Sequence, residues 1–392
     1  MTSVGSARGS KVSGVAIVGA AECDLGVTEK SILTLQTQAI TRALADAGLT
    51  LADVDGIATN NVSRFSATQM ADYLGIVPTW TDSTFAGGSA FEMYLARATQ
   101  AIEAGQASVV VISFASNQRS ARSRKMGGVH EAWIPEAQFE EPYDMLYPLS
   151  YYAMAAQSYL HRYGKTHDQL AEIALAAREW ALLNPKAFRY GKGSLSVTDV
   201  TESTLVSSPL TVGDCCLVTD GGGAIVVTSL ERARDLKQKP VRVLGYGERS
   251  TNTSFTAVAD LSVPGARGSV QDAFSRAGIT AADVDVTEVY DSFTITAALS
   301  LEALGYCGEG EALDFIAGGT IRPGGKLPFN TNGGGLSYCH PGQYGILLLV
   351  EAVRQLRGEC GPRQVDGAEI AVAHGTGGIL STHATVVLGA DR

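Results

Sequence analysis

The sequence predicts an α/β protein made of two related halves, and two observations carry that prediction. The segment ALADAGLTLADVD at residues 43–55 returns as AFSRAGITAADVD at residues 273–285, with eight of thirteen positions identical. In each copy a helical pattern ends at Ala-Gly, where glycine accepts the left-handed backbone conformation that follows many helices. The second observation is that apolar runs suited to buried strands alternate with helical patterns along the chain. We therefore expect two similar halves that bring equivalent loops to one shared site.

Five runs are predicted to be buried strands because they are apolar on both faces, which suits strands covered by helices on both sides. They span residues 12–20, 107–115, 222–230, 240–248 and 369–375. Helices are predicted where apolar residues recur at helical spacing after a turn of small residues or Pro-Gly. They span residues 31–48, 88–105, 267–278, 293–304 and 342–357. The alternation of the two sets indicates a sheet with helices on both faces.

Residues 119–205 break this alternation. The segment is rich in Arg, Tyr and Trp, has few strand patterns, and contains a long amphipathic helix at about residues 166–183. We interpret it as an insertion that forms a cap, or a loop subdomain that faces the ligand and a second subunit. The first half then comprises residues 12–118 and 206–236, the second half residues 240–392, and the linker residues 237–240.

The composition excludes several classes of function. Thirty Lys and Arg against forty Asp and Glu give a net charge of −10 without basic runs, which argues against nucleic-acid binding. No apolar stretch approaches the roughly 20 residues that span a bilayer, and the first 14 residues lack the apolar core of a signal peptide. The six cysteines form no C-x-x-C pair and no zinc-type spacing. We expect a cytoplasmic protein with reduced thiols, no metal site and a flexible polar N-terminal tail.

Four loops are the candidate positions for chemistry. Three of them each end a strand pattern and open a helix pattern, and the fourth follows the last predicted strand. They are residues 84–90, 290–294, 330–342 and 374–378. Glycine lets backbone amides approach a ligand closely, and the N-terminus of a helix favours developing negative charge. One such loop is most often a tight turn, but four at corresponding places in two halves indicate a shared ligand site.

Several motifs carry a family resemblance. VTDGGGA at residues 218–224 and GLSYCHPG at residues 335–342, together with the internal duplication, resemble the thiolase superfamily. In the insertion, YGKT at 163–166, QLA at 169–171 and Asn-Pro at 184–185 are similar to its sterol-carrier-protein-x-like branch. The resemblance covers nearly the whole chain from about residue 12. It implies a five-layered αβαβα fold, a coenzyme A thioester as substrate without a covalently bound cofactor, and a homodimer.

The departures from the thiolase pattern decide the expected chemistry. The cysteine that carries the acyl group in a thiolase falls on Phe85, and the second, acid–base cysteine falls on His374. The Asn or His of the third family motif falls on Tyr290, whereas the histidine of the His-Pro motif is kept as His340. Because two-step acyl transfer needs a covalent acyl-enzyme, a chain without the nucleophile is not expected to catalyse it.

The residues that remain suit an enolate. His340 is expected to donate a hydrogen bond to the thioester oxygen. Tyr290 and Tyr338 are expected to move protons, one from a β-hydroxyl group and the other, or a water, to the α carbon; Tyr344 is an alternative to Tyr338. These steps make a retro-aldol cleavage of a β-hydroxyacyl-CoA to a ketone or aldehyde and a shorter acyl-CoA. The chain resembles thiolase-fold aldolases that remove the side chain of bacterial steroid-CoA catabolites, so a bulky, steroid-like acyl group is expected.

The same resemblance implies a partner. Such aldolases work with a separate small subunit that carries an OB fold and a zinc ribbon and helps to form the acyl-CoA site. We therefore expect a heterotetramer of two copies of this chain and two copies of such a subunit.

Other residues in these loops are expected to support the substrate. Phe85 is interpreted as an apolar pocket wall in the place of the cysteine, and Gly88, His374 and Gly377 as further contacts. Asp291 either orients the preceding tyrosine or caps the following helix, and capping is the more frequent role.

The cysteines leave alternatives open. Cys339 adjoins His340, but neighbours on an extended loop point in different directions, so the two are not expected to form a catalytic dyad. Cys215 and Cys216 precede a buried strand and are expected to be core residues. The alternatives to an aldolase are an acyltransferase that uses Cys339 or another thiol, and a non-catalytic subunit that binds a CoA thioester for a partner.

Overall fold

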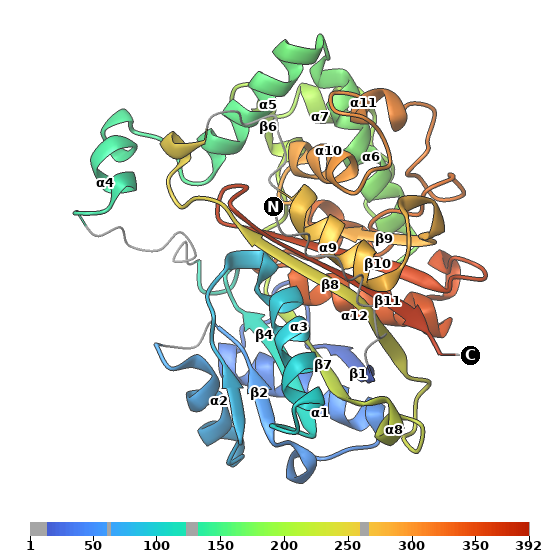
Figure 1. Cartoon of the computed structure of the whole chain (residues 1–392). Coiled ribbons are helices and arrows are strands. Elements are labelled where there is room, and N and C mark those ends of the chain that lie inside the picture. Colours follow the sequence, from blue (N-terminus) through green and yellow to red (C-terminus); the bar gives the residue numbers. More distant parts are fainter. Residues whose placement is uncertain (1–13, 61–63, 123–131, 259–265, 392) are drawn as a thin grey trace, which may run out of the picture.

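The computed structural model describes residues 14–60, 64–122, 132–258 and 266–391, and in this part of the chain nine strands form one sheet (Figure 1). The order across the sheet is β3-β2-β4-β7-β1-β8-β11-β10-β9. The strands are β1 (Val15–Glu22), β2 (Gly56–Ala58), β3 (Trp80–Asp82), β4 (Val109–Ser116), β7 (Gly221–Ser229), β8 (Val241–Ser250), β9 (Val286–Val289), β10 (Ile370–Gly377) and β11 (Thr382–Ala390).

The strand order of the second half repeats that of the first. In the first half β1 pairs antiparallel with β7, β7 antiparallel with β4, β4 parallel with β2, and β2 parallel with β3. In the second half β8, β11, β10 and β9 follow with the same directions, and a parallel bridge between Thr287 and Phe329 takes the place of β3. The two halves meet where β1 pairs with β8. The predicted duplication is confirmed by this topology.

The repeated sequence motif adopts the same local structure twice. The helices α1 (Ile32–Ala47) and α9 (Arg267–Ala277) each end at a left-handed glycine, Gly48 with φ 76° and Gly278 with φ 70°. In both copies a threonine–aspartate capping box then opens a short 3-10 turn that leads to the next strand. The local rules that predict these turns therefore hold in both halves.

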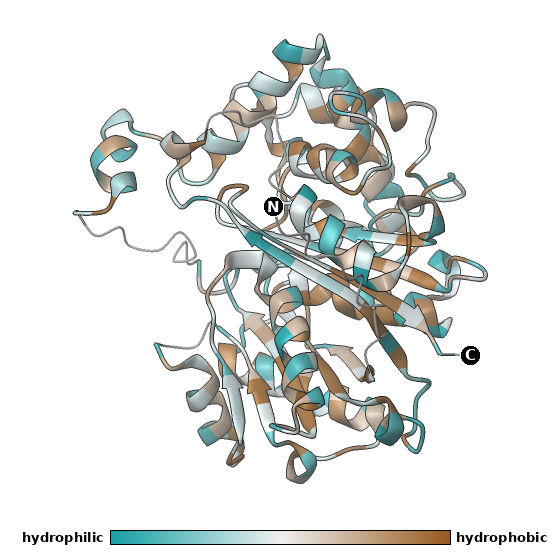
Figure 2. Ribbon diagram, viewed as in Figure 1, coloured by the Kyte–Doolittle hydropathy of each residue, from teal (hydrophilic) through white to brown (hydrophobic). Residues whose placement is uncertain are grey.

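The helices complete five layers. α1 and α2 (Ser66–Leu74) pack on the outer face of the first half, and α9 and α10 (Thr294–Ala303) on the outer face of the second. α3 (Ala90–Glu103) and α12 (Gly345–Arg357) lie between the halves, where each contacts strands of both (Figure 1). Strands of the first half are apolar along most of their length (Figure 2), as burial on both faces requires. The predicted αβαβα succession is confirmed.

The segment between β4 and β7 contains the predicted insertion. It comprises α4 (Pro135–Phe139), α5 (Leu149–Tyr163), α6 (His167–Leu182), α7 (Val197–Thr201) and the separate sheet of β5 (Leu205–Ser207) and β6 (Leu210–Thr211). α5 and α6 pack against α10, while α4 projects away from the rest of the molecule (Figure 1). The division of the chain at residues 118, 205 and 240 stays a prediction. Outside the insertion, α8 (Leu230–Ala233) and α11 (Ala312–Phe315) are single helical turns.

All five predicted strands and all six predicted helices are present, with ends that differ by a few residues. The sequence patterns do not predict β2, β3, β9 and β11. The first three are three or four residues long, too short to establish a period. β11 begins with the polar residues Thr382, His383 and Thr385, which hide its apolar character. The predicted N-terminal tail lies outside the described residues.

Candidate active site

The side chains of Tyr290 and His340 meet in a buried pair. Tyr290 follows the end of β9, and His340 belongs to the glycine-rich loop that precedes α12. The Tyr290 hydroxyl oxygen lies 2.9 Å from His340 Nε2 and 3.3 Å from the carbonyl oxygen of Gly342. The two rings are perpendicular, with centroids 5.5 Å apart. Two residues from separate candidate loops therefore form one hydrogen-bonded unit.

Both members of this pair are neutral near pH 7. Burial lowers the pKa of His340 to about 4 and raises the pKa of Tyr290 well above its usual value of 10. A neutral imidazole nitrogen can accept a proton, and a neutral phenol can donate one. Because a free phenolate is disfavoured, Tyr290 can take a proton from a substrate while it passes its own proton to His340.

Asp291 holds the loop that carries His340. Its buried carboxylate accepts hydrogen bonds from the amides of Gly335 at 2.6 Å and Leu336 at 3.3 Å. The loop turns here in one π-helical turn, and a Cβ at Gly334 would lie 2.0 Å from the carboxylate, so this position needs glycine. The expected capping role of Asp291 is wrong, because α10 has no side-chain cap. The aspartate instead fixes the turn that leads to His340.

The glycine loop before α3 packs directly against Tyr290. A Cβ at Gly88 would lie 1.9 Å from Cε2 of the Tyr290 ring, so a side chain there would displace the ring. Gly377 of β10 gives room to the same loop, since its Cβ would lie 1.9 Å from the carbonyl oxygen of Ala86. Contact of either glycine with substrate stays a prediction. Their visible effect is to let the loop approach the tyrosine.

Phe85 is 68 % exposed in the isolated chain. Its role as an apolar wall of the substrate pocket stays a prediction. The loop packs inward through Ala86 and Gly88, which leaves the preceding side chain outside.

The side chain of His374 points away from the glycine loop before α3. Successive residues of a strand point to opposite faces, and in β10 it is Gly375 that faces α3. The His374 ring is fully buried on the other face, where it lines a small cavity against α10 together with Thr296 and Ser300. It therefore lies behind α10 and apart from the space around Tyr290.

Tyr338 is held by a buried ion cluster. Its hydroxyl donates to Oε1 of Glu22 at 2.8 Å, and Glu22 also binds Arg354 and, at 3.2 Å, Lys186. This contact favours a structural role for Tyr338. We do not assign it a proton transfer.

Tyr344 lies beside the pair but points elsewhere. Its ring centroid is 6.0 Å from that of Tyr290, and its ring stacks near His340. Its hydroxyl donates to Asn332 Oδ1 at 2.7 Å. Tyr344 thus packs the site, and the hydroxyl that faces the histidine is that of Tyr290.

The thiols next to the site are poor nucleophiles. Cys339 is fully buried, with Sγ 3.2 Å from Thr219 Oγ1, and burial raises its pKa to about 12. Cys215 and Cys216 are half-buried rather than fully buried, and Cys215 packs against the core of the second half. Burial raises the pKa of the Cys216 thiol well above its usual value. Because the thiolate is the reactive form, these residues do not replace the missing cysteine.

Two hydroxyl residues lie beside the pair although no sequence pattern indicates a role for them. Tyr152 of α5 stacks on Phe293 with centroids 4.5 Å apart, and its hydroxyl donates to the carbonyl of Gly378 at 3.2 Å. Ser292 interacts with the Tyr152 hydroxyl and lies 3.1 Å from Thr296 Oγ1. Ser292 lies in the candidate loop of residues 290–294. Tyr152 lies in the insertion, and no local pattern reveals how the insertion packs on α10.

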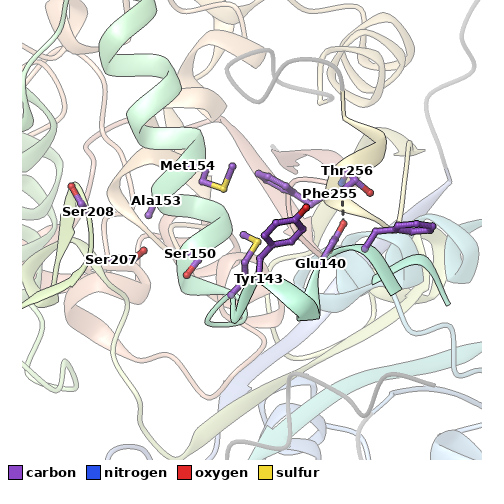
Figure 3. Close-up of a pocket in the computed structure, with 11 residues that line it drawn as sticks. Glu140, Tyr143, Ser150, Ala153, Met154, Ser207, Ser208, Phe255 and Thr256 are labelled. Carbon is purple, nitrogen blue, oxygen red and sulfur yellow. Dashed lines mark hydrogen bonds between the residues drawn. The ribbon is translucent and has the colours of Figure 1, made fainter. Parts of the chain in front are cut away.

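One cavity beside α5 does not belong to this site. It has a volume of about 440 Å³ and a mostly apolar lining that includes Tyr143, Met154 and Phe255 (Figure 3). Met154 and Tyr152 are two residues apart on α5, so they point roughly 200° apart around the helix. Because Tyr152 faces the pair, this cavity opens on the opposite side of α5. It lies between the insertion and the 3-10 turn at Phe255–Ala257.

Glu92 of α3 gives a testable pH dependence. It is fully buried, neither carboxyl oxygen has a hydrogen-bond partner among the described residues, and burial raises its pKa to about 8. In the unfolded chain this carboxyl ionises near pH 4.5, whereas in the folded protein it stays protonated up to about pH 8. The free energy of unfolding is therefore highest below pH 4.5 and falls as the pH rises toward 8. The variant Glu92→Gln is therefore expected to be more stable than wild type by about 3 kcal/mol at pH 7. Urea unfolding of both proteins at pH 4.5 and pH 7 measures this difference; a gap that does not change with pH would contradict it.

Comparisons with known proteins agree with the fold and with the class of enzyme. A family model for thiolase C-terminal domain-like proteins matches residues 247–390. A 17-hydroxy-3-oxo-4-pregnene-20-carboxyl-CoA lyase of Mycobacterium tuberculosis is 38% identical, with 92% of this chain and 96% of the lyase covered. A steroid side-chain-cleaving aldolase of Thermomonospora curvata is 34% identical, with 95% and 98% covered. The solved structure of an Ltp2-ChsH2(DUF35) aldolase superposes with a TM-score of 0.87 at 32% identity, covering 96% of this chain and 98% of that chain.

The fold and the site define an enzyme of thiolase type that lacks the cysteine nucleophile of the first glycine-rich loop. The chain belongs to the thiolase-like family, in the branch that contains these aldolases and lyases, and it is a carbon–carbon lyase. No helix in the described ranges is both long and apolar enough to cross a membrane. The expected absence of a metal site stays a prediction.

Proposed function

We propose that this protein catalyses retro-aldol cleavage of a bulky, steroid-like β-hydroxyacyl-CoA to a ketone or aldehyde and a shorter acyl-CoA. The observation that carries the proposal is the Tyr290–His340 pair, with a hydroxyl 2.9 Å from a neutral imidazole nitrogen, in a thiolase fold whose first glycine-rich loop, residues 84–90, contains no cysteine. The relatives that act on steroid CoA esters, at 34% and 38% identity over almost the whole chain, support the substrate class.

The proposed reaction uses the pair twice. Tyr290 takes the proton of the β-hydroxyl group as its own proton moves to Nε2 of His340. The bond between the α and β carbons breaks, the β carbon becomes the carbonyl of the ketone or aldehyde, and the electron pair enters the thioester as an enolate. The proton then returns through Tyr290 to the α carbon. The lowered pKa of His340 helps this return, because a buried imidazolium gives up its proton readily.

This mechanism changes one expected role. His340 Nε2 already faces the Tyr290 hydroxyl, so it does not also donate to the thioester oxygen from that atom. The enolate oxygen needs another donor, since an enolate forms only where positive dipoles stabilise its oxygen.

We also propose the predicted assembly: a cytoplasmic homodimer that binds two copies of a small subunit with an OB fold and a zinc ribbon. The support is the superposed aldolase, whose structure contains ChsH2(DUF35) as a second component. The exposed aromatic residues Trp133, Phe139 and Tyr143 in and around the projecting α4 fit a surface that another subunit covers.

A product assay tests the function. The protein, alone and with a small zinc-ribbon protein encoded beside it, is incubated with a panel of β-hydroxyacyl-CoA esters, and the products are identified by mass spectrometry. Formation of a carbonyl product and a shorter acyl-CoA without added free CoA is the expected result, because thiolysis consumes CoA and retro-aldol cleavage does not. Turnover that requires free CoA would establish a thiolase instead.

Thiol alkylation separates the aldolase from a cysteine-dependent acyltransferase. Treatment with iodoacetamide is expected to leave most activity intact, since the described thiols near the site are protonated and the mechanism uses none. Mass spectrometry of the intact protein after incubation with acyl-CoA should find no acylated cysteine. Loss of activity with substrate protection at one cysteine would favour the acyltransferase.

A further inference from the structure

A polar cluster lies buried between the sheet and the helices α9 and α10. On β10 and β11, His374 stands opposite Thr385 and Thr376 opposite His383. The two histidine rings stack with centroids 5.6 Å apart. Such a group of polar side chains in a core layer must have its hydrogen bonds satisfied, yet Nε2 of the fully buried His374 has no partner among the described residues.

The hydrogen bonds around His374 determine which ring nitrogen carries the proton. The Ser269 hydroxyl donates to the carbonyl of Ala266 at 2.8 Å, so it can only accept from Thr385, 3.0 Å away. Thr385 has one hydroxyl proton and gives it to Ser269, so it accepts from His374 Nδ1 at 2.8 Å. The Nδ1 atom therefore carries the proton, and Nε2 presents a bare lone pair. The unsatisfied group is an acceptor.

This acceptor faces a cavity of the size of one water molecule. The cavity has a volume of about 10 Å³, close to the smallest that holds a water. Its polar lining comes from His374, His383, Thr376, Thr296 and Ser300. The Ser300 hydroxyl donates to the carbonyl of Thr296 at 2.8 Å, so it too can only accept. A water here would donate one proton to His374 and the other to a hydroxyl of α10.

The cavity is connected to the active site along α10. Thr296 Oγ1 lies 3.1 Å from Ser292 Oγ, and Ser292 directly precedes the N-cap of this ten-residue helix. If the water donates to Thr296, the Thr296 hydroxyl is free to donate to Ser292. The Tyr152 hydroxyl, the other neighbour of Ser292, already donates to Gly378. The proton of Ser292 is then left for a ligand at the N-terminus of α10.

We propose that the cavity beside His374 holds one ordered water, and that this water, through Thr296, turns the hydroxyl of Ser292 toward the substrate as the donor to the thioester oxygen. The proposal rests on the proposed function, because it supplies the enolate donor that His340 does not. Ser292 follows Tyr290 by two residues and is slightly exposed, as Tyr290 and His340 are. The positive end of the α10 dipole adds to the attraction for an enolate oxygen. His374 and Thr296 are positioning residues that act through Ser292.

Spectroscopy tests the water site independently of catalysis. Long-range ¹H–¹⁵N correlation of histidine-labelled protein is expected to assign the Nδ1–H tautomer to His374 over the neutral pH range, and a high-resolution crystal structure is expected to contain a water within hydrogen-bond distance of Nε2. An Nε2–H tautomer or an empty cavity would overturn the site.

Kinetics test the catalytic part. Ser292→Ala is expected to lower kcat by about a hundredfold, with KM little changed, because it removes one donor to the enolate oxygen. Valine has nearly the same shape as threonine, and Thr296→Val is expected to lower kcat by about tenfold. The double variant Ser292→Ala/Thr296→Val is expected to have a kcat no lower than that of Ser292→Ala. Ser300→Ala, which lines the same cavity, is the control and should retain wild-type kcat.

The outcomes separate the two proposals. If wild type cleaves its substrate and Ser292→Ala cleaves it equally well, the inference is wrong and the proposed function stands. The same holds if Ser300→Ala loses as much activity as Thr296→Val, since any disturbance of the core would then explain both. If wild type cleaves no β-hydroxyacyl-CoA in the panel, the proposed function is wrong, and so is the role of Ser292 as a donor to the thioester oxygen.

Discussion

Replacing Tyr290 with phenylalanine is expected to lower kcat for carbon–carbon cleavage by about 10²- to 10⁴-fold, the range that general acid–base groups contribute. The variant keeps the ring that packs against Gly88 and loses only the hydroxyl, which lies 2.9 Å from His340 Nε2. The substrate proton then has no route to the imidazole. Steady-state assays of the carbonyl product, with CoA-ester binding measured separately, give kcat and affinity. If Tyr290→Phe keeps its affinity for the CoA ester but loses turnover, the alternative that this chain only binds the CoA ester for a catalytic partner is also excluded.

Tyr338→Phe is the matched control. It removes a hydroxyl from a residue two positions before His340 in the same loop, but that hydroxyl donates to Glu22. We expect kcat within a few-fold of wild type. The variant His340→Gln should lose about as much activity as Tyr290→Phe, and the double variant should be little worse than either, because the two groups act as one unit. Equal losses in Tyr338→Phe and Tyr290→Phe would contradict the assignment.

The two phenols illustrate what the sequence could predict of the site. The motifs around Tyr290 and His340 were sufficient to identify both as functional candidates, because each motif consists of residues that are neighbours in the sequence. The role of Tyr338 was not predictable, because its partner Glu22 lies 316 positions away in the chain and is carried by β1. The exposure of Phe85 was not predictable for a related reason, because the direction of a loop side chain depends on how the backbone packs.

The fold was predictable where patterns are long or repeated. The duplicated Ala-Gly turns predict matching helix ends, and the structure has left-handed glycines at both, Gly48 and Gly278. Long apolar runs such as β1 and β4 are evident because every residue in them is buried. Short strands such as β2 form because neighbouring strands present open backbone groups, and that cause lies outside their own sequence.

The ion cluster at Glu22 leads to the largest expected effect on stability. Glu22 is buried in β1, and burial by itself would raise its pKa; attraction and hydrogen bonds from Arg354 outweigh this and hold the pKa well below its usual range. Arg354 is carried by α12, so the pair ties the central helix layer to the first half of the sheet. The variant Arg354→Met is expected to lose about 3–5 kcal/mol of the free energy of unfolding, because it leaves a buried carboxylate without its main partner.

The sign of the pH dependence distinguishes this explanation from a simple loss of packing. In wild type the depressed pKa of Glu22 stabilises the folded state above the usual carboxyl pKa of 4.5, and this stabilisation is lost as the pH falls below it. In Arg354→Met the buried carboxylate is instead unfavourable at neutral pH, so lowering the pH toward 5 should narrow the gap to wild type. Adding Glu22→Gln to Arg354→Met removes the unpaired buried carboxylate and should recover part of the lost stability. Urea unfolding at pH 5 and pH 7 measures the stability of wild type, Glu22→Gln, Arg354→Met and the double variant. If the double variant is less stable than Arg354→Met, the arginine contributes by packing rather than by compensating the charge of Glu22.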